Sequence, residues 1–320
     1  MTEYFKLLFR PLSVLRLIKS FLVRSLRPLS RRNKYSEQVY NEIAVRKDRV
    51  LRTKRTILLE GHKKEISEES WAEYECRKFD QIVRILFPAL SAKSNLNVLE
   101  IGIGEGGTLQ KIHDALLRSE FSELSSNINW FGCDLTYARL NNLKLNVNAS
   151  VVNCDAKKLP YANTSFDIVY THNVLEQIPR DFKYVVDEAM RIGGSYLAME
   201  PTLEYGDLDA KINILLKDHL VGLEKYIKSK HLNYERIIPE VVAKATNPAM
   251  YYLMHSISEE NNSEKEVRLV CPDSRQLLSK THDSLQTADN KIAYPMVNNI
   301  PMILDRHKVN VEKNIRSTAI

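Results

Sequence analysis

Five short apolar runs occur between residues 97 and 199, and each is followed by a turn or a helical stretch. The runs are residues 97–101, 129–133, 150–153, 166–170 and 195–199. Strands that alternate with helical segments are typical of βαβ units, which build a parallel sheet with helices on both faces. The pattern therefore predicts an α/β fold. The chain has 320 residues, 44% of them hydrophobic, which suffices for one such domain and a smaller appended unit.

The charge of the chain is unevenly distributed. Nine basic side chains against one acid give residues 1–35 a charge of +8, which leaves −2 of the net +6 for the rest of the chain. Binding of nucleic acid normally needs a basic stripe on the folded domain itself. We therefore expect no nucleic-acid partner. The four cysteines include no CxxC pair, so we expect neither disulfides nor zinc, and a reducing cytoplasm fits best.

Residues 1–35 have the pattern of an amphipathic helix. Apolar residues recur there at three- and four-residue steps with arginines between them, interrupted near Pro11 and Pro28. No stretch of about 18 residues lacks charge, so a spanning helix is not expected. One interpretation is peripheral contact with an anionic membrane surface. The alternatives are a helix docked on the body, a flexible tail or a mitochondrial transit peptide.

Three segments follow from these patterns. They are the basic arm of residues 1–35, a main domain of residues 36–262 that starts with charged helices up to about residue 90, and a small β unit with a tail in residues 263–320.

The first apolar run leads into a glycine-rich turn. It contains Glu100, Gly102, Gly104 and Gly106, and a helical stretch follows. Glycines let the backbone turn sharply and approach a ligand, and the helix offers its first amides. Gly102, Gly104 and Gly107 also satisfy the GxGxxG pattern of dinucleotide enzymes, and a turn without a ligand is another alternative. A buried carboxylate at Glu100 needs a cationic partner, which disfavours a dinucleotide phosphate.

Two further acids end the second and third runs. Asp134 precedes Leu135, and a carboxylate at the end of a second strand accepts hydrogen bonds from ribose hydroxyls. A helix-capping role is the alternative for this residue. Asp155 and Ala156 follow the third run. The pattern predicts an adenosine site at these strand ends.

The order of these motifs resembles the class I S-adenosylmethionine-dependent methyltransferases of the small-molecule and ubiquinone-biosynthesis type. The resemblance covers residues 96–202 and includes the glycine turn, the two acids and the later block from Leu159-Pro160 to Ile178-Pro179. It implies a Rossmann-like class I methyltransferase sheet with helices on both faces. It also implies a fifth strand at residues 193–201, an antiparallel pair from 234–242 and 249–257, and a helical segment at 208–231. The N-terminal helical arm and the small C-terminal β unit complete the expected fold.

The resemblance also implies a set of S-adenosylmethionine-binding residues. Asp155 would bind the adenine amino group, and Ala156 would offer a backbone amide to the ring. Thr171, His172 and Asn173 would line the floor beneath the sulfur. The full expected cofactor set is Glu100, Gly102, Gly104, Gly106, Asp134, Leu135, Asp155, Ala156, Thr171 and Asn173.

Residues 267–274 and 293–304 resemble the small Trm112-like domain, which often carries CPxC near its start and whose stand-alone versions partner methyltransferases. Ser274 stands where the second cysteine would fall after Cys271, so no zinc or other metal is expected. The alternative is a β-hairpin that packs on the body.

The predicted reaction is methyl transfer, most simply O-methylation of a small-molecule, glycan or lipid-linked acceptor. His172 is the candidate catalytic base and His219 the second candidate, with a structural histidine as the alternative for both. Two other classes stay open. One is a non-catalytic methyltransferase-like binding or scaffold protein, and the other is an NAD-dependent oxidoreductase.

Overall fold

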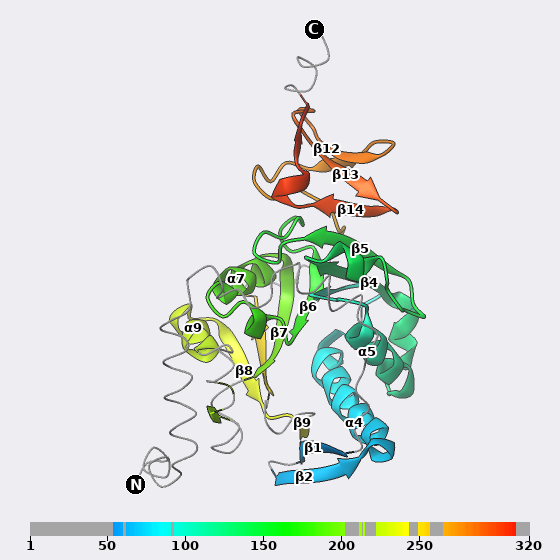
Figure 1. Ribbon diagram of the computed structural model, residues 1–320, viewed down its shortest axis with the longest axis vertical. Coiled ribbons are helices and arrows are strands. Elements are labelled where there is room, and N and C mark those ends of the chain that lie inside the picture. Colours follow the sequence, from blue (N-terminus) through cyan, green and yellow to red (C-terminus); the bar gives the residue numbers. More distant parts are fainter. Residues whose placement is uncertain are drawn as a thin grey trace.

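The computed structural model of the chain describes residues 54–59, 62–90, 93–201, 211–212, 214, 222–242, 249–256 and 265–311. The predicted arm of residues 1–35 and the candidate base His219 lie outside these residues. Among the residues described, no helix is long and apolar enough to cross a membrane. One large mixed sheet runs through the molecule, with helices against it (Figure 1).

Five parallel strands form the centre of this sheet. They are β3 (Leu96–Ile101), β4 (Ile128–Asp134), β5 (Ala149–Cys154), β6 (Phe166–His172) and β7 (Gly193–Pro201). Their spatial order is β5-β4-β3-β6-β7, followed by the antiparallel strands β10 (Ala249–His255) and β8 (Asn233–Ile237). The five predicted strands and the predicted antiparallel pair are confirmed. The strand order reverses between β3 and β6, where α/β sheets have their ligand crevice.

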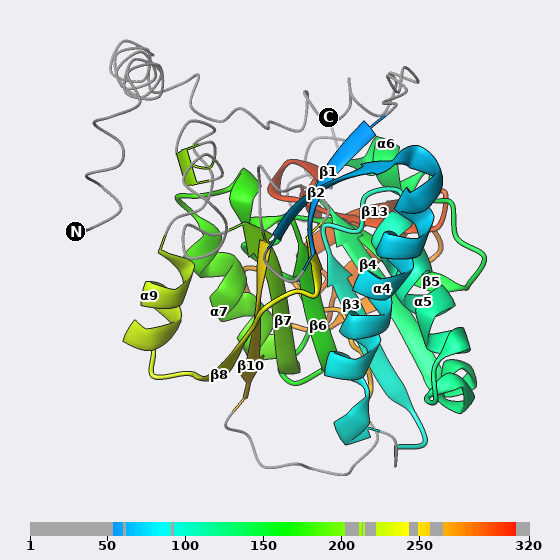
Figure 2. The same ribbon diagram turned by 90° about the horizontal axis from the view of Figure 1, so that it is seen from below.

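Helices cover both faces of the sheet, as Figure 2 shows. They are α4 (Glu68–Leu86) and α5 (Gly107–Arg118) on one face, and α7 (Phe182–Ile192) and α9 (Leu223–Ser229) on the other. Short helical turns are η2 (Pro88–Leu90), η3 (Ser122–Asn127), α6 (Tyr137–Leu140) and η4 (Leu175–Gln177). The fold class predicted from the sequence is confirmed.

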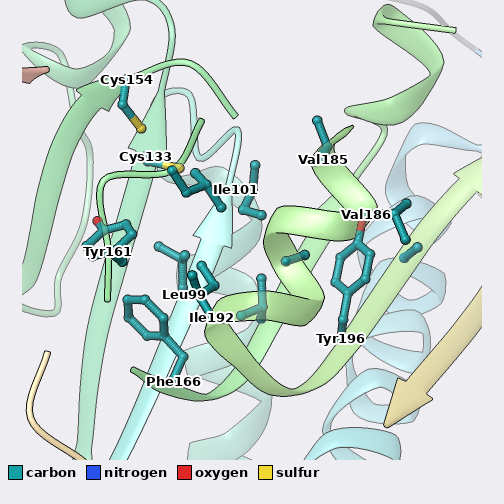
Figure 3. Close-up of a cluster of buried hydrophobic side chains, with 14 of the residues drawn as sticks. Leu99, Ile101, Cys133, Cys154, Tyr161, Phe166, Val185, Val186, Ile192 and Tyr196 are labelled. Carbon is teal, nitrogen blue, oxygen red and sulfur yellow. The ribbon is translucent and has the colours of Figure 1, made fainter. Parts of the chain in front are cut away.

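Successive side chains of β3 alternate between the two cores because a strand has a two-residue period. Val98 packs with the residues of α4 and α5, whereas Leu99 and Ile101 pack with those of α7. Figure 3 shows the second of these cores, in which Leu99 and Ile101 of β3 belong to the same buried cluster as Val185 of α7 and Tyr196 of β7. This alternation decides which face each site residue occupies.

Residues 54–67 differ from the prediction, which made them part of a helical segment. They form the antiparallel strands β1 (Lys54–Leu59) and β2 (His62–Ser67), and β1 also pairs with β9 (Val241–Val242). Helix α4 begins only after Ser67, whose Oγ accepts a hydrogen bond from the Ser70 amide at 3.3 Å. The charged composition suggested a helix, but pairing with β9, distant in the sequence, stabilises the strands.

The C-terminal unit continues the central sheet. Its elements are β11 (Leu278–Lys280), β12 (Ser284–Thr287), β13 (Ile292–Val297), β14 (Ile300–Ile303), η5 (Asp305–His307) and β15 (Val309–Asn310). Strand β14 pairs in parallel with β5, placing Met302 opposite Asn153 and Ile303 opposite Cys154. The edge that β5 would expose is therefore covered, which removes a site for unwanted strand pairing. Figure 1 shows the unit stacked beyond β5.

Candidate functional site

The glycine turn connects β3 to α5 at the reversal of strand order. Gly102, Gly104 and Gly106 have φ angles of +76°, +58° and +87°, in the left-handed region that glycine adopts without strain. The Gly102 and Ile103 amides donate to the Cys133 carbonyl at 2.7 and 3.0 Å, which holds the turn against the end of β4. Sequence and structure agree on this turn.

Glu100 lies at the base of the turn and is only 2% exposed. Its Oε2 accepts a hydrogen bond from the Tyr170 hydroxyl at 3.1 Å. Burial raises the pKa of this carboxyl to about 8, although the bonds from Tyr170 and from the Leu109 amide favour the ionised form. A bound cation beside it would favour the carboxylate.

Asp134 ends β4 next to the turn and is 8% exposed. Its Oδ2 accepts from the Gly104 amide at 2.9 Å, and its Oδ1 accepts from the Thr136 amide at 2.8 Å. Burial raises the pKa of this carboxyl, and the charge of Arg139 opposes the shift. The Arg139 Nη1 lies 3.8 Å from Oδ2. Two backbone donors thus fix the orientation of the carboxylate at the end of the strand.

The ends of β4 and β5 are tied together by a residue that the sequence patterns did not single out. Asn153 is fully buried, and its side-chain amide donates to the carbonyls of Asp134 and Leu135, both at 2.9 Å. Leu135 is 37% exposed, an apolar side chain next to the acid. On the adjoining loop Asp155 is partly exposed, and its Oδ1 accepts from the Lys157 amide at 2.9 Å. Ala156 is partly buried beside it.

Strand β6 ends with three predicted floor residues, and strand alternation separates their side chains. Thr171 is fully buried, with its Oγ1 2.9 Å from the Tyr196 hydroxyl on the α7 side of the sheet. His172 lies on the opposite face, toward α4 and α5. Asn173 is exposed in the left-handed region at φ +58° and donates its amide to the Met199 carbonyl at 3.1 Å.

Both ring nitrogens of His172 contact side chains of neighbouring helices. The Lys78 Nζ lies 2.8 Å from Nε2, and the Thr108 Oγ1 lies 3.0 Å from Nδ1. An ammonium group only donates. Nε2 is therefore the acceptor, and Nδ1 carries the hydrogen that it donates to Thr108. Lys78, a buried residue of α4, occupies the lone pair that a general base would use.

A third buried carboxyl lies behind the loop that follows β6. Glu200 of β7 is fully buried and accepts from the amides of Val174 and Glu176 at 3.0 and 3.2 Å. Burial raises its pKa to about 8, although these amides favour the ionised form. The bonds hold Val174 near Gly102, where a Cβ added to the glycine would lie 2.5 Å from the Val174 Cγ2. Glu200 thereby fixes the position of Val174 beside the glycine turn.

The residues at the crevice fit an adenosine-containing cation. A left-handed glycine turn, a carboxyl buried below it and an oriented carboxylate at the next strand end supply backbone donors and acidic acceptors. No group of three or more histidine, cysteine, aspartate or glutamate side chains that could hold a metal occurs among the described residues.

Comparison with known proteins adds a domain assignment. No curated protein matches the sequence. The CurJ carbon methyltransferase is similar in structure, with 16% sequence identity and a TM-score of 0.43. The similarity covers 60% of this chain and only 56% of the CurJ chain. The plantazolicin methyltransferase BpumL in complex with S-adenosylhomocysteine is similar at 12% identity and a TM-score of 0.42, covering 59% of this chain and 86% of that one.

A SAM-dependent methyltransferase from Aquifex aeolicus is similar at 13% identity and a TM-score of 0.41, covering 57% of this chain and 93% of that one. In sequence, residues 98–193 match a family model described as a methyltransferase domain. This match contains the glycine turn, both neighbouring acids and the end of β6.

Proposed function

We propose that the chain is an S-adenosylmethionine-dependent methyltransferase that binds its cofactor across the ends of β3, β4, β5 and β6. The observation that carries the proposal is the pair of buried carboxyls, Glu100 and Asp134, on either side of a left-handed glycine turn. The match of residues 98–193 to a methyltransferase domain supports it. When bound, the cofactor supplies a methyl group on a sulfonium, which is already activated for transfer.

Each site residue then has a defined role. Glu100 would face the ammonium group of the methionine part, and Asp134 would accept from the ribose hydroxyls. Asp155 and the Ala156 amide would bind the adenine, against the exposed side chain of Leu135. Such binding and the exclusion of water can supply much of the rate acceleration in methyl transfer.

The acceptor in this proposal is a hydroxyl of a small molecule, a glycan or a lipid-linked compound. A hydroxyl must lose its proton, and the Nε2 of His172 is the candidate base. In the structure Lys78 donates to that atom, so Lys78 has to give up the contact before His172 takes a proton. Loss of a single methyl group from lipid or glycan extracts of a deletion strain, measured by mass spectrometry, would identify the acceptor.

The C-terminal unit is proposed to be Trm112-like without zinc. The Cys271 thiol is 3.5 Å from the Tyr294 hydroxyl. Burial would raise the pKa of this thiol, but hydrogen bonds from Ser274, Tyr294 and the turn amides lower it below the ordinary cysteine value. Ser274 thus contacts the sulfur where the family often has a second cysteine. Elemental analysis that finds stoichiometric zinc would overturn the metal-free assignment.

The ribose role of Asp134 gives the direct test of the cofactor proposal. Isothermal titration of the full chain should detect binding of S-adenosylmethionine and S-adenosylhomocysteine but not of NAD. Asp134→Ala should abolish measurable S-adenosylhomocysteine binding because it removes the acceptor of the ribose hydroxyls. Asp80→Ala, which removes an exposed acid paired with Arg118, should bind as the wild type does. Binding of NAD alone would favour an oxidoreductase, and binding of none of the three would favour a scaffold protein.

A further inference from the structure

Arg139 places its guanidinium over the glycine turn. The residue lies in α6, one turn after Asp134, and its side chain is 30% exposed. A Cβ built on Gly104 would collide with the Arg139 Nη2 and Cζ. The guanidinium therefore fills the space beside the Gly104 α-carbon, at the point where a glycine turn lets a ligand approach the backbone.

The neighbours of the three turn glycines differ in kind. Gly102 faces a methyl group of Val174, and Gly106 faces the side chain of Leu145. These are apolar contacts, and moving them would disturb packing. Gly104 instead faces the far end of a long, partly exposed and flexible side chain. At Gly104 a change of the Arg139 rotamer would open the space, at the cost of contacts such as its ion pair with Asp134.

Charge explains why a cation lies there. Burial raises the pKa of Glu100 and of Asp134, and the charge of Arg139 lowers the pKa of both. Two buried carboxyls close to each other favour a nearby positive charge. The Arg139 guanidinium, 3.8 Å from Asp134 Oδ2, supplies that charge.

We propose that the Arg139 guanidinium, which lies beside Gly104 and Asp134, occupies part of the cofactor cradle and competes with the cofactor for it. The proposal rests on the proposed function. S-adenosylmethionine carries a sulfonium, an ammonium and a carboxylate, so its net charge is +1, whereas S-adenosylhomocysteine has lost the sulfonium charge and is neutral. Both ligands carry the ammonium that would face Glu100, but only the methyl donor adds the sulfonium. The donor therefore replaces the positive charge of Arg139 in the site better than the product does. Return of Arg139 to Gly104 therefore favours release of the product.

Isothermal titration of the full chain with both ligands tests this assignment. Arg139→Met keeps a long side chain and removes the charge. This variant should bind S-adenosylhomocysteine more tightly than the wild type does, because no guanidinium has to be displaced. Its affinity for S-adenosylmethionine should rise further, by about tenfold over the wild type. Arg139→Lys keeps the charge and should keep a ratio of the two dissociation constants close to that of the wild type. Arg118→Met removes the exposed partner of Asp80 and should change neither constant.

The possible failures are distinguishable. If the wild type binds both ligands and folded Arg139→Met binds them with equal or lower affinity, Arg139 is a structural partner or a direct ligand contact, and the assignment is wrong. If the wild type binds neither ligand, the proposed function fails and this assignment fails with it. Arg139→Gln, neutral but able to hydrogen-bond to Asp134, gives the same comparison if melting curves show that methionine impairs folding.

Discussion

Glu200 shows how a single buried carboxyl can make the stability of this fold depend on pH. Its pKa of about 8 lies well above the ordinary glutamate value because the side chain has no solvent around it. Between the ordinary glutamate pKa and about pH 8, the folded state therefore holds a proton that the unfolded chain has released. This contribution to stability is complete below the ordinary glutamate pKa and is lost as the pH rises through about 8.

Replacing this carboxyl should flatten the pH dependence. In Glu200→Gln the free energy of unfolding should fall less between pH 5 and pH 9 than in the wild type. The difference in slope should approach about 1.4 kcal/mol per pH unit where only the unfolded state is ionised. Denaturant melts over this range measure it, and Glu123→Gln, at an exposed glutamate, should follow the wild-type curve. Parallel curves for wild type and Glu200→Gln would show that Glu200 does not titrate there.

Individual site residues were predictable where they lie at the carboxyl end of a strand. Glu100 and Asp134 could be placed from sequence because the ends of parallel strands meet at one edge of the sheet. Lys78 and Arg139 could not, since they come from helices whose docking no local pattern records. The two-residue period of a strand would have placed the side chains of Thr171 and His172 on opposite faces of β6, because successive side chains of a strand face opposite ways.

At the scale of elements, Glu188 connects α7, the loop after β5 and the C-terminal unit. Its carboxylate accepts from the Leu159 amide at 2.7 Å, from Arg191 at 2.8 Å and from Arg275 at 3.0 Å. Burial would raise its pKa, but these bonds lower it. The contribution to stability is thus present above the ordinary glutamate pKa and is lost as the pH falls below it.

The neutral variant should separate this connection from ordinary surface charge. Glu188→Gln should lower the free energy of unfolding at pH 7 by about 1–2 kcal/mol, after allowance for its partial exposure. Asp187→Asn, at the adjacent acid of α7 in an exposed ion pair, should cost less than about 0.5 kcal/mol. Chemical denaturation of both variants is the measurement. Equal losses would mean that Glu188 does not link the three elements.

The order of elements was predictable over residues 96–202 because each strand is a short apolar run bounded by turn signals. The hairpin of residues 54–67 was not, since its pairing with β9 depends on a partner far along the chain. The same limit applies to β14. Its apolar side chains indicated burial, but no pattern in the sequence specifies that it pairs with β5.

For the whole molecule, the junction of β14 with β5 means that the central sheet and the C-terminal unit share one core. Ile303 is almost fully buried beside Cys154. The adjoining loop is held from the same side, because the Val270 amide donates to the Pro160 carbonyl at 2.9 Å. A unit this small gathers little core of its own without metal or disulfides and depends on its neighbour.

Removing the C-terminal unit should therefore destabilise the body. A chain ending at residue 262 should melt at a lower temperature or be insoluble, because it exposes the edge of β5 and the apolar surface beneath β14. In the full chain Ile303→Ala should lower the free energy of unfolding by about 2–4 kcal/mol. Val309→Ala, on the exposed strand β15, should change it far less, and a metal chelator should leave the melting temperature unchanged. If the truncated body melts where the full chain does and Ile303→Ala costs no more than Val309→Ala, the two parts do not share a core.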